Sequence, residues 1–265
     1  MKDKLIVLIC HYNNLEGLRQ SLMSIKEDFP VDVLVIDDGS SDKPNYSDLK
    51  AIYLNGEIFL ELLPENMGVG KASNFGFQKI MSMNYQYTGR LDCGDVNHQG
   101  RYKKQLDYLE QNPSVKILGT WVNMVDMDGN VLYVLRHPTS YQAIQNKMYL
   151  NSTFVNSATI FDVTVLREVG LFPEKYHRNG EDYAFYIKAI KKFKAENLPE
   201  VLLDYEVNPN SLSSTRRAEQ VKARMSIIKD NFYFGFYPIY GLIRNSIIRY
   251  LPQEFLLSLK RKLFK

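Results

Sequence analysis

The feature that most constrains the fold is an alternation of short apolar runs with helix-forming segments in residues 1–112. The apolar runs are continuous, which is typical of strands buried on both faces of a parallel sheet. The segments between them carry apolar residues at helical spacing, which predicts helices packed on both faces of that sheet. The expected strands are 4–10, 31–36, 57–63 and 87–92, and the expected helices are 15–25, 71–83 and 101–111.

The remainder of the chain has a more mixed pattern. An Asp-Gly pair at residues 128–129 indicates a turn between two strands. Residues 231–265 form a separate tail, described below. Between residues 113 and 230, strands are expected at 117–121, 131–135, 157–161 and 201–205, and helices at 141–149, 163–169, 181–190 and within 211–229.

The composition is that of a globular protein, with 45% hydrophobic and 24% charged residues. Its two cysteines, Cys10 and Cys93, favour a reducing compartment over a disulfide framework. The net charge of +3 is unevenly distributed, because residues 231–265 hold six bases and one acid. No stretch reaches the ~18 uninterrupted apolar residues that a membrane-spanning helix needs. We therefore expect a cytoplasmic protein with a slightly acidic body and a basic tail.

Three of the first four expected strands end in polar loops. These loops are His11-Tyr12-Asn13, Asp37-Asp38-Gly39-Ser40 and Asp92 to Asp95. The carboxyl ends of parallel strands meet at one edge of a sheet, where α/β proteins bind ligands. Asp, Gly and Asn are also common in turns, and Ser40 is a good helix cap, so ordinary turns and caps are the alternative.

In order and spacing, these motifs resemble those of the family 2 glycosyltransferases. The resemblance covers about residues 4–210 and implies the α/β GT-A fold, a Rossmann-like and mostly parallel sheet flanked by helices. It implies an enzyme that moves a sugar from a nucleotide-sugar to a saccharide with inversion, in the assembly of bacterial capsule, O-antigen or lipooligosaccharide. The segments that carry it are Ile9 to Asn13, Val35 to Asp42, Asn66-Met67-Gly68 with Ala72 and Asn74, Leu91 to Asp95, Arg101 with Gln105 and Leu109, and Gly180 to Tyr183.

The same resemblance divides the chain and assigns the donor site. Residues 1–230 would be the GT-A domain, with a nucleotide-binding half at 1–112 and an acceptor-binding half at 113–230. A UDP-sugar is the favoured donor, with a dTDP-sugar as the alternative, and Asp37 or Asp38 is expected to accept a hydrogen bond from the base. The implied donor-binding residues are His11, Tyr12, Asn13, Asp37, Asp38, Gly39, Ser40, Asn66, Gly68, Lys71, Asn74, Arg90 and Asp92.

A divalent cation is expected beside the donor, because a departing diphosphate leaves negative charge that Mg²⁺ or Mn²⁺ neutralises. The family's usual motif is Asp-x-Asp, and here its third position is Gly94. The resemblance therefore implies Asp92 and Asp95 as metal ligands. The departure at Gly94 also leaves open a catalytically inactive protein of the same fold that only binds nucleotide-sugars.

Glu181 and Asp182 open a predicted helix, whose dipole favours an ionised carboxylate at that end. An inverting transfer needs a base that takes the proton of the acceptor hydroxyl. By resemblance Asp182 is that base and Glu181 positions the acceptor. The alternative is that both are ordinary first-turn acids that stabilise the helix.

The tail, residues 231–265, mixes aromatic, apolar and basic residues at helical spacing, with an interruption at Pro252. This pattern predicts a helix that lies on the inner face of the cytoplasmic membrane, close to a lipid-linked saccharide acceptor. Packing on the body or a contact within an oligomer is the alternative, and no nucleic-acid-binding module is recognisable.

A sugar nucleotidyltransferase is a rival function, disfavoured because residues 11–14 lack a Gly-rich basic phosphate loop.

Overall fold

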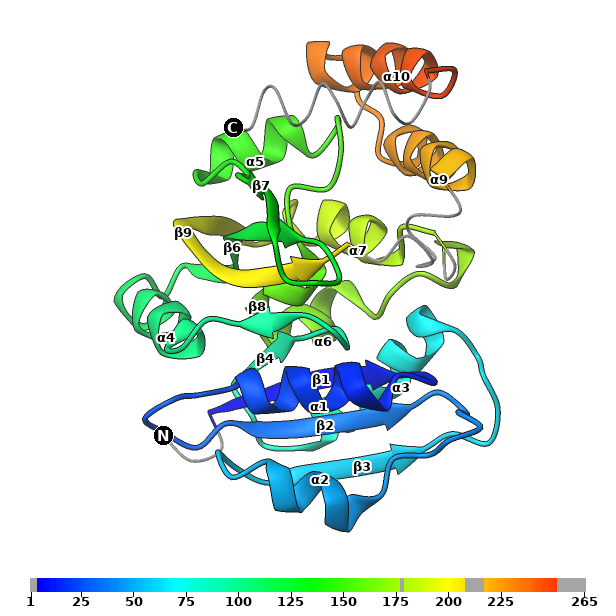
Figure 1. Ribbon diagram of the computed structural model, residues 1–265. Helices are drawn as coiled ribbons and strands as arrows, with labels where there is room; N and C mark the ends of the chain where they lie inside the picture. The colour runs from blue at the N-terminus through cyan, green and yellow to red at the C-terminus, as the bar shows by residue number, and fades with distance from the viewer. Residues whose placement is uncertain (1–3, 177–178, 208–216, 252–265) are drawn as a thin grey trace.

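The computed structural model describes residues 4–176, 179–207 and 217–251, and its centre is a nine-stranded sheet with helices packed against it (Figure 1). The strands are β1 (Leu5–His11), β2 (Asp32–Asp37), β3 (Ile58–Leu62), β4 (Tyr87–Arg90), β5 (Val96–Asn97), β6 (Val115–Val125), β7 (Val131–Leu135), β8 (Ile160–Asp162) and β9 (Lys194–Glu206). The helices are α1 (Leu15–Ser24), α2 (Tyr46–Ile52), α3 (Val69–Ser82), α4 (Arg101–Gln111), α5 (Tyr141–Lys147), η1 (Asn156–Ala158), α6 (Thr164–Val169), η2 (Glu174–Tyr176), α7 (Glu181–Ala189), α9 (Arg217–Asp230) and α10 (Phe236–Ile248).

The strand order is β3-β2-β1-β4-β8-β6-β9-β5, with β7 paired to β6. β1 to β4 are mutually parallel, and the register places His11 beside Asp37 and Leu8 beside Arg90. Their carboxyl ends therefore meet at one edge, as the sequence predicts. β8 and β7 are antiparallel to their neighbours, while β6 and β9 pair in parallel. The predicted α/β class, with a mostly parallel sheet between helices, is confirmed.

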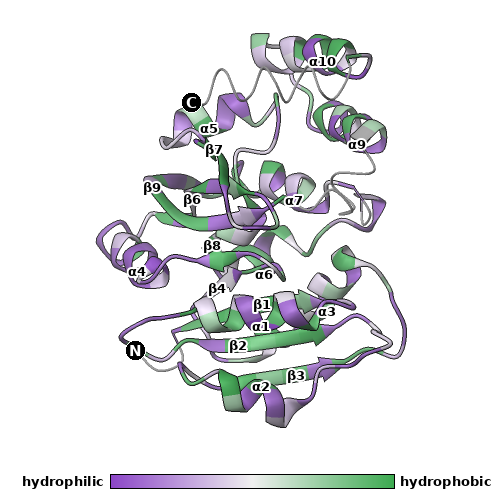
Figure 2. Ribbon diagram, in the orientation of Figure 1, coloured by the Kyte–Doolittle hydropathy of each residue, from purple (hydrophilic) through white to green (hydrophobic). Residues whose placement is uncertain are grey.

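Each central strand is buried on both faces, which explains its continuous apolar sequence. Alternate residues of β1 enter different core clusters, with Val7 packed among residues of α1 and α4 and Leu8 among residues of α3 and α7. Figure 2 shows the contrast between these hydrophobic strands and the mixed polarity of the helices that cover them. Burial of this apolar surface is the main favourable contribution to folding.

Three predicted strands have clearly different bounds. The strand predicted over 117–121 is the middle of the longer β6. The segment predicted as a strand over 157–161 begins as the 3₁₀ turn η1, and pairing starts only at β8. The strand predicted over 201–205 is the last part of β9, which begins at Lys194. The first half of β9 contains polar residues and Pro199, so its sequence does not have the apolar pattern of a strand. The parallel pairing with β6 shifts register around that proline. The prediction also omits the short elements α2 and β5.

Within the tail, α10 is docked on the body, as the packing alternative proposed. It packs through Gly241, where an added Cβ would lie 2.0 Å from the Tyr149 carbonyl oxygen, so only glycine allows this approach. Asn245 Nδ2 donates to the Leu150 carbonyl oxygen at 3.2 Å. The opposite side of the helix carries exposed apolar residues, which we call the α10 stripe: Phe236, Ile239, Tyr240, Ile243 and Ile247.

Within the three described stretches, no helix combines the length and the apolar character that crossing a bilayer requires. Pro252 and the rest of the predicted tail helix, residues 252–265, lie outside the described residues.

Candidate functional site

The ends of β1 and β2 are joined by a buried pair, His11 and Asp37. His11 Nδ1–H donates to Asp37 Oδ1 at 2.8 Å, and His11 Nε2 accepts from the Asn14 backbone N–H at 3.1 Å. Because Nε2 accepts this hydrogen bond, the N–H of the ring that faces Asp37 is the one on Nδ1. Asp37 Oδ2 also accepts from the Ser40 backbone N–H at 3.2 Å. The side chains of His11 and Asp37, both predicted to bind the donor, thus hold the carboxyl ends of β1 and β2 together.

Asp38 fastens the loop that precedes α3. Its two carboxylate oxygens accept from the backbone N–H groups of Met67 and Gly68, at 2.8 and 2.9 Å. Burial raises the pKa of Asp38, and these two hydrogen bonds oppose the shift. Gly39 lets the two loops approach, since it has φ of +69° and an added Cβ would lie 2.3 Å from the Glu65 carbonyl carbon. The end of β2 and the loop before α3 therefore form one fixed cradle.

Other predicted donor-binding residues lie on the exposed side of this cradle. The side chain of Tyr12 is 51% exposed, and Asn66 and Lys71 are also exposed. Asn13 adopts a φ of +48°, which asparagine tolerates better than most residues, and its backbone N–H donates to Ser40 Oγ at 2.9 Å. Side chains able to meet a ligand are therefore available beside the buried carboxylates.

Asn74 has a different place from the other predicted donor residues. Its side-chain amide donates to the Phe172 carbonyl oxygen and accepts from the Phe172 backbone N–H, both at 2.9 Å. One N–H and the oxygen of this amide hold α3 against the segment before α7. The structure therefore gives Asn74 a bridging contact between sequence-distant elements.

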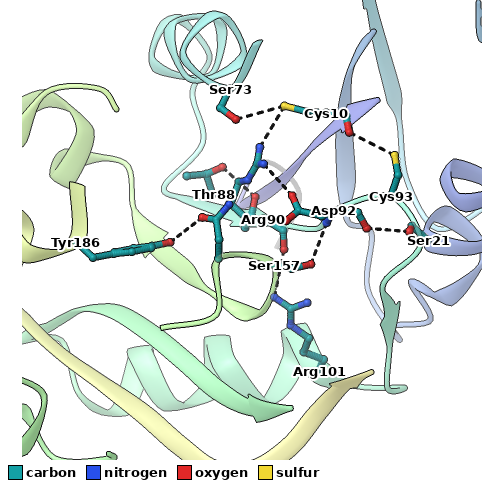
Figure 3. A network of polar contacts seen from close by, with 12 residues as sticks. Cys10, Ser21, Ser73, Thr88, Arg90, Asp92, Cys93, Arg101, Ser157 and Tyr186 are labelled. Carbon is teal, nitrogen blue, oxygen red and sulfur yellow. Dashed lines mark hydrogen bonds and ion pairs between the residues drawn. The ribbon is translucent and has the colours of Figure 1, made fainter. Parts of the chain in front are cut away.

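Arg90 and Asp92 form the centre of the polar network in Figure 3. Arg90 Nη2 donates to Asp92 Oδ1 at 2.9 Å, and Arg90 Nη1 lies 3.4 Å from Cys10 Sγ. Burial alone would lower the pKa of Arg90, but Cys10 and Asp92 beside it raise that pKa. The Arg90 side chain is fully buried, whereas the Asp92 side chain is 40% exposed. Asp92 therefore presents a negative charge at the rim of the site, while its partner Arg90 stays buried.

Asp92 to Asp95 form a tight turn in which the Asp95 backbone N–H donates to the Asp92 carbonyl oxygen at 3.1 Å. Asp95 itself is buried, and its Oδ1 accepts from the Glu206 backbone N–H at 3.0 Å. Its Oδ2 is buried and makes no hydrogen bond to the described residues. Burial raises the pKa of Asp95 well above its ordinary value, and the charge of Asp92 adds to this effect. Its assignment as a metal ligand stays a prediction.

Two serines outside the predicted set of site residues hold this turn from behind. Ser21 Oγ lies 3.1 Å from the Asp92 carbonyl oxygen and 2.9 Å from that of Asp95, and it accepts from the Gly94 backbone N–H. Ser157 Oγ accepts from the Asp92 backbone N–H at 2.9 Å. Ser21 gave a signal in the sequence, since it interrupts the apolar face of a predicted helix with a hydroxyl. The sequence does not predict the contact that Ser157 makes, because its partner is 65 residues away.

Glu181 and Asp182 begin α7 after Gly180, which has a φ of +86°. Both side chains are half-buried. Burial and the neighbouring Asp182 raise the pKa of Glu181 to about 7. Burial also raises the pKa of Asp182, and the charge of Asp92 acts in the same direction. The predicted catalytic pair is thus within electrostatic reach of the Asp92 rim, although the two lie about ninety residues apart in the sequence.

The described residues hold no convergent group of three or more His, Cys, Asp or Glu side chains that would form a ready-made cation cage. Such a cage is not required for Mg²⁺ or Mn²⁺ at a diphosphate, since these ions bind through one or two carboxylates, substrate phosphates and water. The exposed Asp92 carboxylate fits that kind of donor set.

Comparison with known proteins connects this geometry to a family. The sequence pattern described as "Glycosyl transferase family 2" matches residues 6–170. The chain is 27% identical over 252 residues to an Escherichia coli UDP-Gal:alpha-D-GlcNAc-diphosphoundecaprenol beta-1,3-galactosyltransferase, covering 93% of this chain and 84% of that protein. It is 26% identical to the Erwinia amylovora amylovoran biosynthesis glycosyltransferase AmsE, covering 97% of this chain and 98% of that protein.

Solved structures agree in fold. Staphylococcus aureus TarS superposes with a TM-score of 0.66 at 19% identity, over 97% of this chain and 45% of that one. The Pyrobaculum calidifontis mannosyltransferase PcManGT, in complex with GDP-Man and Mn²⁺, gives 0.64 at 15% identity, over 96% of this chain and 72% of that one. The fold is the expected GT-A fold, and the family match spans more than half of the chain. The protein belongs to glycosyl transferase family 2.

Proposed function

We propose that the protein is an inverting glycosyltransferase that moves a sugar from a UDP-sugar to a lipid-linked saccharide during assembly of a bacterial surface polysaccharide. The observation that carries the proposal is the pair of half-buried carboxylates, Glu181 and Asp182, in the first turn of α7. Burial raises both pKa values, and the charge of Asp92 adds to the effect. A carboxylate with a raised pKa is a better proton acceptor than an ordinary aspartate. A base within electrostatic reach of Asp92 would suit attack on the anomeric carbon of a donor bound there.

The step proposed is a single displacement. The acceptor hydroxyl oxygen forms a bond to the anomeric carbon, while the bond from that carbon to the diphosphate oxygen breaks. The hydroxyl proton passes to Asp182, and the bonding electron pair leaves with the nucleoside diphosphate. Glu181, the other acid of this first turn, positions the acceptor.

The nucleotide would lie along the cradle formed by Asp38 and Gly39, with Tyr12, Asn66 and Lys71 at its exposed side. A bound Mg²⁺ or Mn²⁺ would neutralise the charge that develops on the diphosphate. Asp92 is the residue best placed to hold it, as an exposed oxygen ligand on a fixed turn. A UDP-sugar is favoured over a dTDP-sugar because the E. coli relative is named for UDP-Gal and TarS has been crystallised with UDP and UDP-GlcNAc.

A lipid-linked acceptor is supported by the E. coli relative, whose name specifies a diphosphoundecaprenol acceptor. The α10 stripe is the surface through which the protein would lie on the cytoplasmic face of the membrane, where such an acceptor is anchored. The alternative is that the α10 stripe forms a contact between copies of this chain in an oligomer.

A panel of UDP-, dTDP- and GDP-sugars with Mn²⁺ tests the donor, by the shift in melting temperature of the purified protein. We expect stabilisation by UDP-sugars and by UDP, and the best donor is then used for transfer to a synthetic diphospholipid-linked saccharide. The anomeric configuration of the product is read by NMR, and inversion is expected. Retention of the configuration, or stabilisation by GDP-sugars alone, would contradict the proposal.

A further inference from the structure

The turn that carries Asp92 cannot readily carry a second carboxylate at its third position. Gly94 is the third residue of the four-residue turn Asp92–Asp95 and has a φ of +102°. Side chains other than glycine are strained at such a φ, and this turn geometry calls for glycine there. Its backbone N–H is also held by Ser21 Oγ at 3.0 Å. The loss of the usual second Asp is therefore built into the shape of this loop.

A carboxylate from another strand lies over Gly94. An added Cβ at Gly94 would lie 3.4 Å from Cδ, Oε1 and Oε2 of Glu206, an ordinary van der Waals distance. The Glu206 carboxylate thus occupies the space into which a side chain at position 94 would project. Glu206 is the last residue of β9, and its backbone N–H donates to Asp95 Oδ1 at 3.0 Å.

The Asp95 contact gives Glu206 a fixed position beside the turn. The pairing of Glu206 with Val125 of β6 also holds its backbone in place. Within the described parts of the chain, no hydrogen bond or ion pair engages the Glu206 carboxylate, although its side chain is only half-exposed. The Glu206 carboxylate is therefore partly open to solvent beside the turn and is available to a cation.

We propose that Glu206 supplies, together with Asp92, the second carboxylate for the divalent cation at the donor diphosphate. This inference rests on the proposed function and deepens it, because it assigns to β9 the ligand that position 94 lacks. Carboxylate oxygens are the ligands that Mg²⁺ and Mn²⁺ prefer, and two of them suffice when phosphate and water complete the shell. Asp95 then has the structural task of fixing Glu206, which accounts for its burial.

The test is Mn²⁺ binding by the full-length protein, followed through the electron paramagnetic resonance signal of free Mn²⁺ with UDP present. Glu206→Gln keeps the size of the side chain and removes its charge. We expect at least tenfold weaker Mn²⁺ binding in the presence of UDP, on the scale of effects seen when a metal site loses one supporting group. The matched control is Glu200→Gln on the same strand, whose carboxylate pairs with Lys104 at the surface. This control should bind Mn²⁺ as the wild type does.

A second measurement, UDP-sugar affinity in EDTA, separates a metal role from a sugar contact. We expect Glu206→Gln to match the wild type there and to keep its melting temperature. Wild-type Mn²⁺ affinity in Glu206→Gln would overturn the inference while leaving the glycosyltransferase proposal intact. Loss of UDP-sugar affinity in EDTA would overturn it too and would make Glu206 a sugar contact. If the wild-type protein bound no Mn²⁺ with UDP, the metal part of the proposed function would fail together with this inference.

Discussion

The fully buried Arg90 side chain donates a hydrogen bond of 2.9 Å to the Asp92 carboxylate, whose side chain is 40% exposed. The pair joins the floor of the site to the rim where a donor would bind. Removing one member of such a pair leaves a buried charge without compensation, which costs more than the pair itself contributes. Substitutions at Asp92 should therefore change stability and function together, and the two effects must be measured separately.

Asp92→Asn is expected to lower the free energy of unfolding by about 1–3 kcal/mol, because the buried Arg90 guanidinium loses its counter-ion. It should also abolish the increase in transfer rate that Mn²⁺ gives. Urea denaturation and initial rates over a Mn²⁺ series provide the two readings. Asp107→Asn, which removes only an exposed ion pair with Lys103, serves as the control. Full Mn²⁺ activation in Asp92→Asn would remove Asp92 from the metal site.

Asp182→Asn should fold, bind donor nearly as well as the wild type, and transfer sugar ~10²–10⁴-fold more slowly. The amide keeps the shape of the side chain but cannot accept the acceptor's proton, so the loss belongs in kcat rather than in donor affinity. Steady-state kinetics beside a melting temperature distinguish this from a helix-capping role, which would cost about 1 kcal/mol of stability and little turnover. A destabilised but fully active variant would leave Glu181 as the candidate base.

The raised pKa of Glu181 predicts a pH-dependent stability. Its folded pKa of about 7 lies above the ordinary value of 4.5, so the folded state binds the proton more tightly. The stability that this group contributes is complete below about pH 4.5 and is lost as the pH rises through about 7, by about 1.4 kcal/mol for each pH unit in that window. Glu181→Gln should therefore gain stability relative to the wild type between pH 5 and pH 8.

Urea denaturation of both proteins at those two pH values measures the difference. Glu168→Gln, at an exposed position on α6, is the control and should track the wild type. A constant difference between wild type and Glu181→Gln at both pH values would show that this carboxyl is not perturbed.

The α10 stripe predicts binding to anionic vesicles. Deletion of residues 239–265 tests it coarsely, because it also removes the packing contacts of Gly241 and Asn245. Ile243→Ser with Ile247→Ser is sharper, since both side chains are exposed, at 56% and 57%. Loss of their apolar area should weaken co-sedimentation with vesicles roughly tenfold or more and leave the melting temperature unchanged.

Leu54→Ser is the matched control, because Leu54 is 88% exposed and lies outside the tail. It should bind vesicles as the wild type does. If the double variant also bound as the wild type does and instead changed a dimer to a monomer in light scattering, the stripe would be a contact between copies of this chain.

The sequence predicts the parallel strands of this fold well because each is a continuous apolar run that needs burial on both faces. It also predicts which loops meet at the edge, since parallel strands such as β1 and β2 end together. It does not predict the partners of the rim carboxylates. The two oxygens of Asp38, for example, accept from backbone N–H groups nearly thirty residues away, which no local pattern indicates.

The same limit applies to the turn at Gly94. The local motif predicts Asp95 as the second carboxylate, and that assignment stays a prediction. The motif gives no sign of Glu206, whose side chain lies over Gly94 from more than a hundred residues later. The pairing of β9 with β5 and with β6 brings that residue to the turn. Contacts of such sequence separation depend on topology rather than on any pattern within one segment.

The continuous sheet has a consequence for how the molecule responds to heat and to ligand. β4 and β8 are paired through Gly89 and Ile160, so strands from before and after residue 112 share one ladder. Neither half can open without breaking main-chain bonds of the other, which makes the sheet a single cooperative unit. A calorimetric scan should show one transition, and a nucleotide at the β1–β2 edge should slow amide hydrogen exchange as far away as β9.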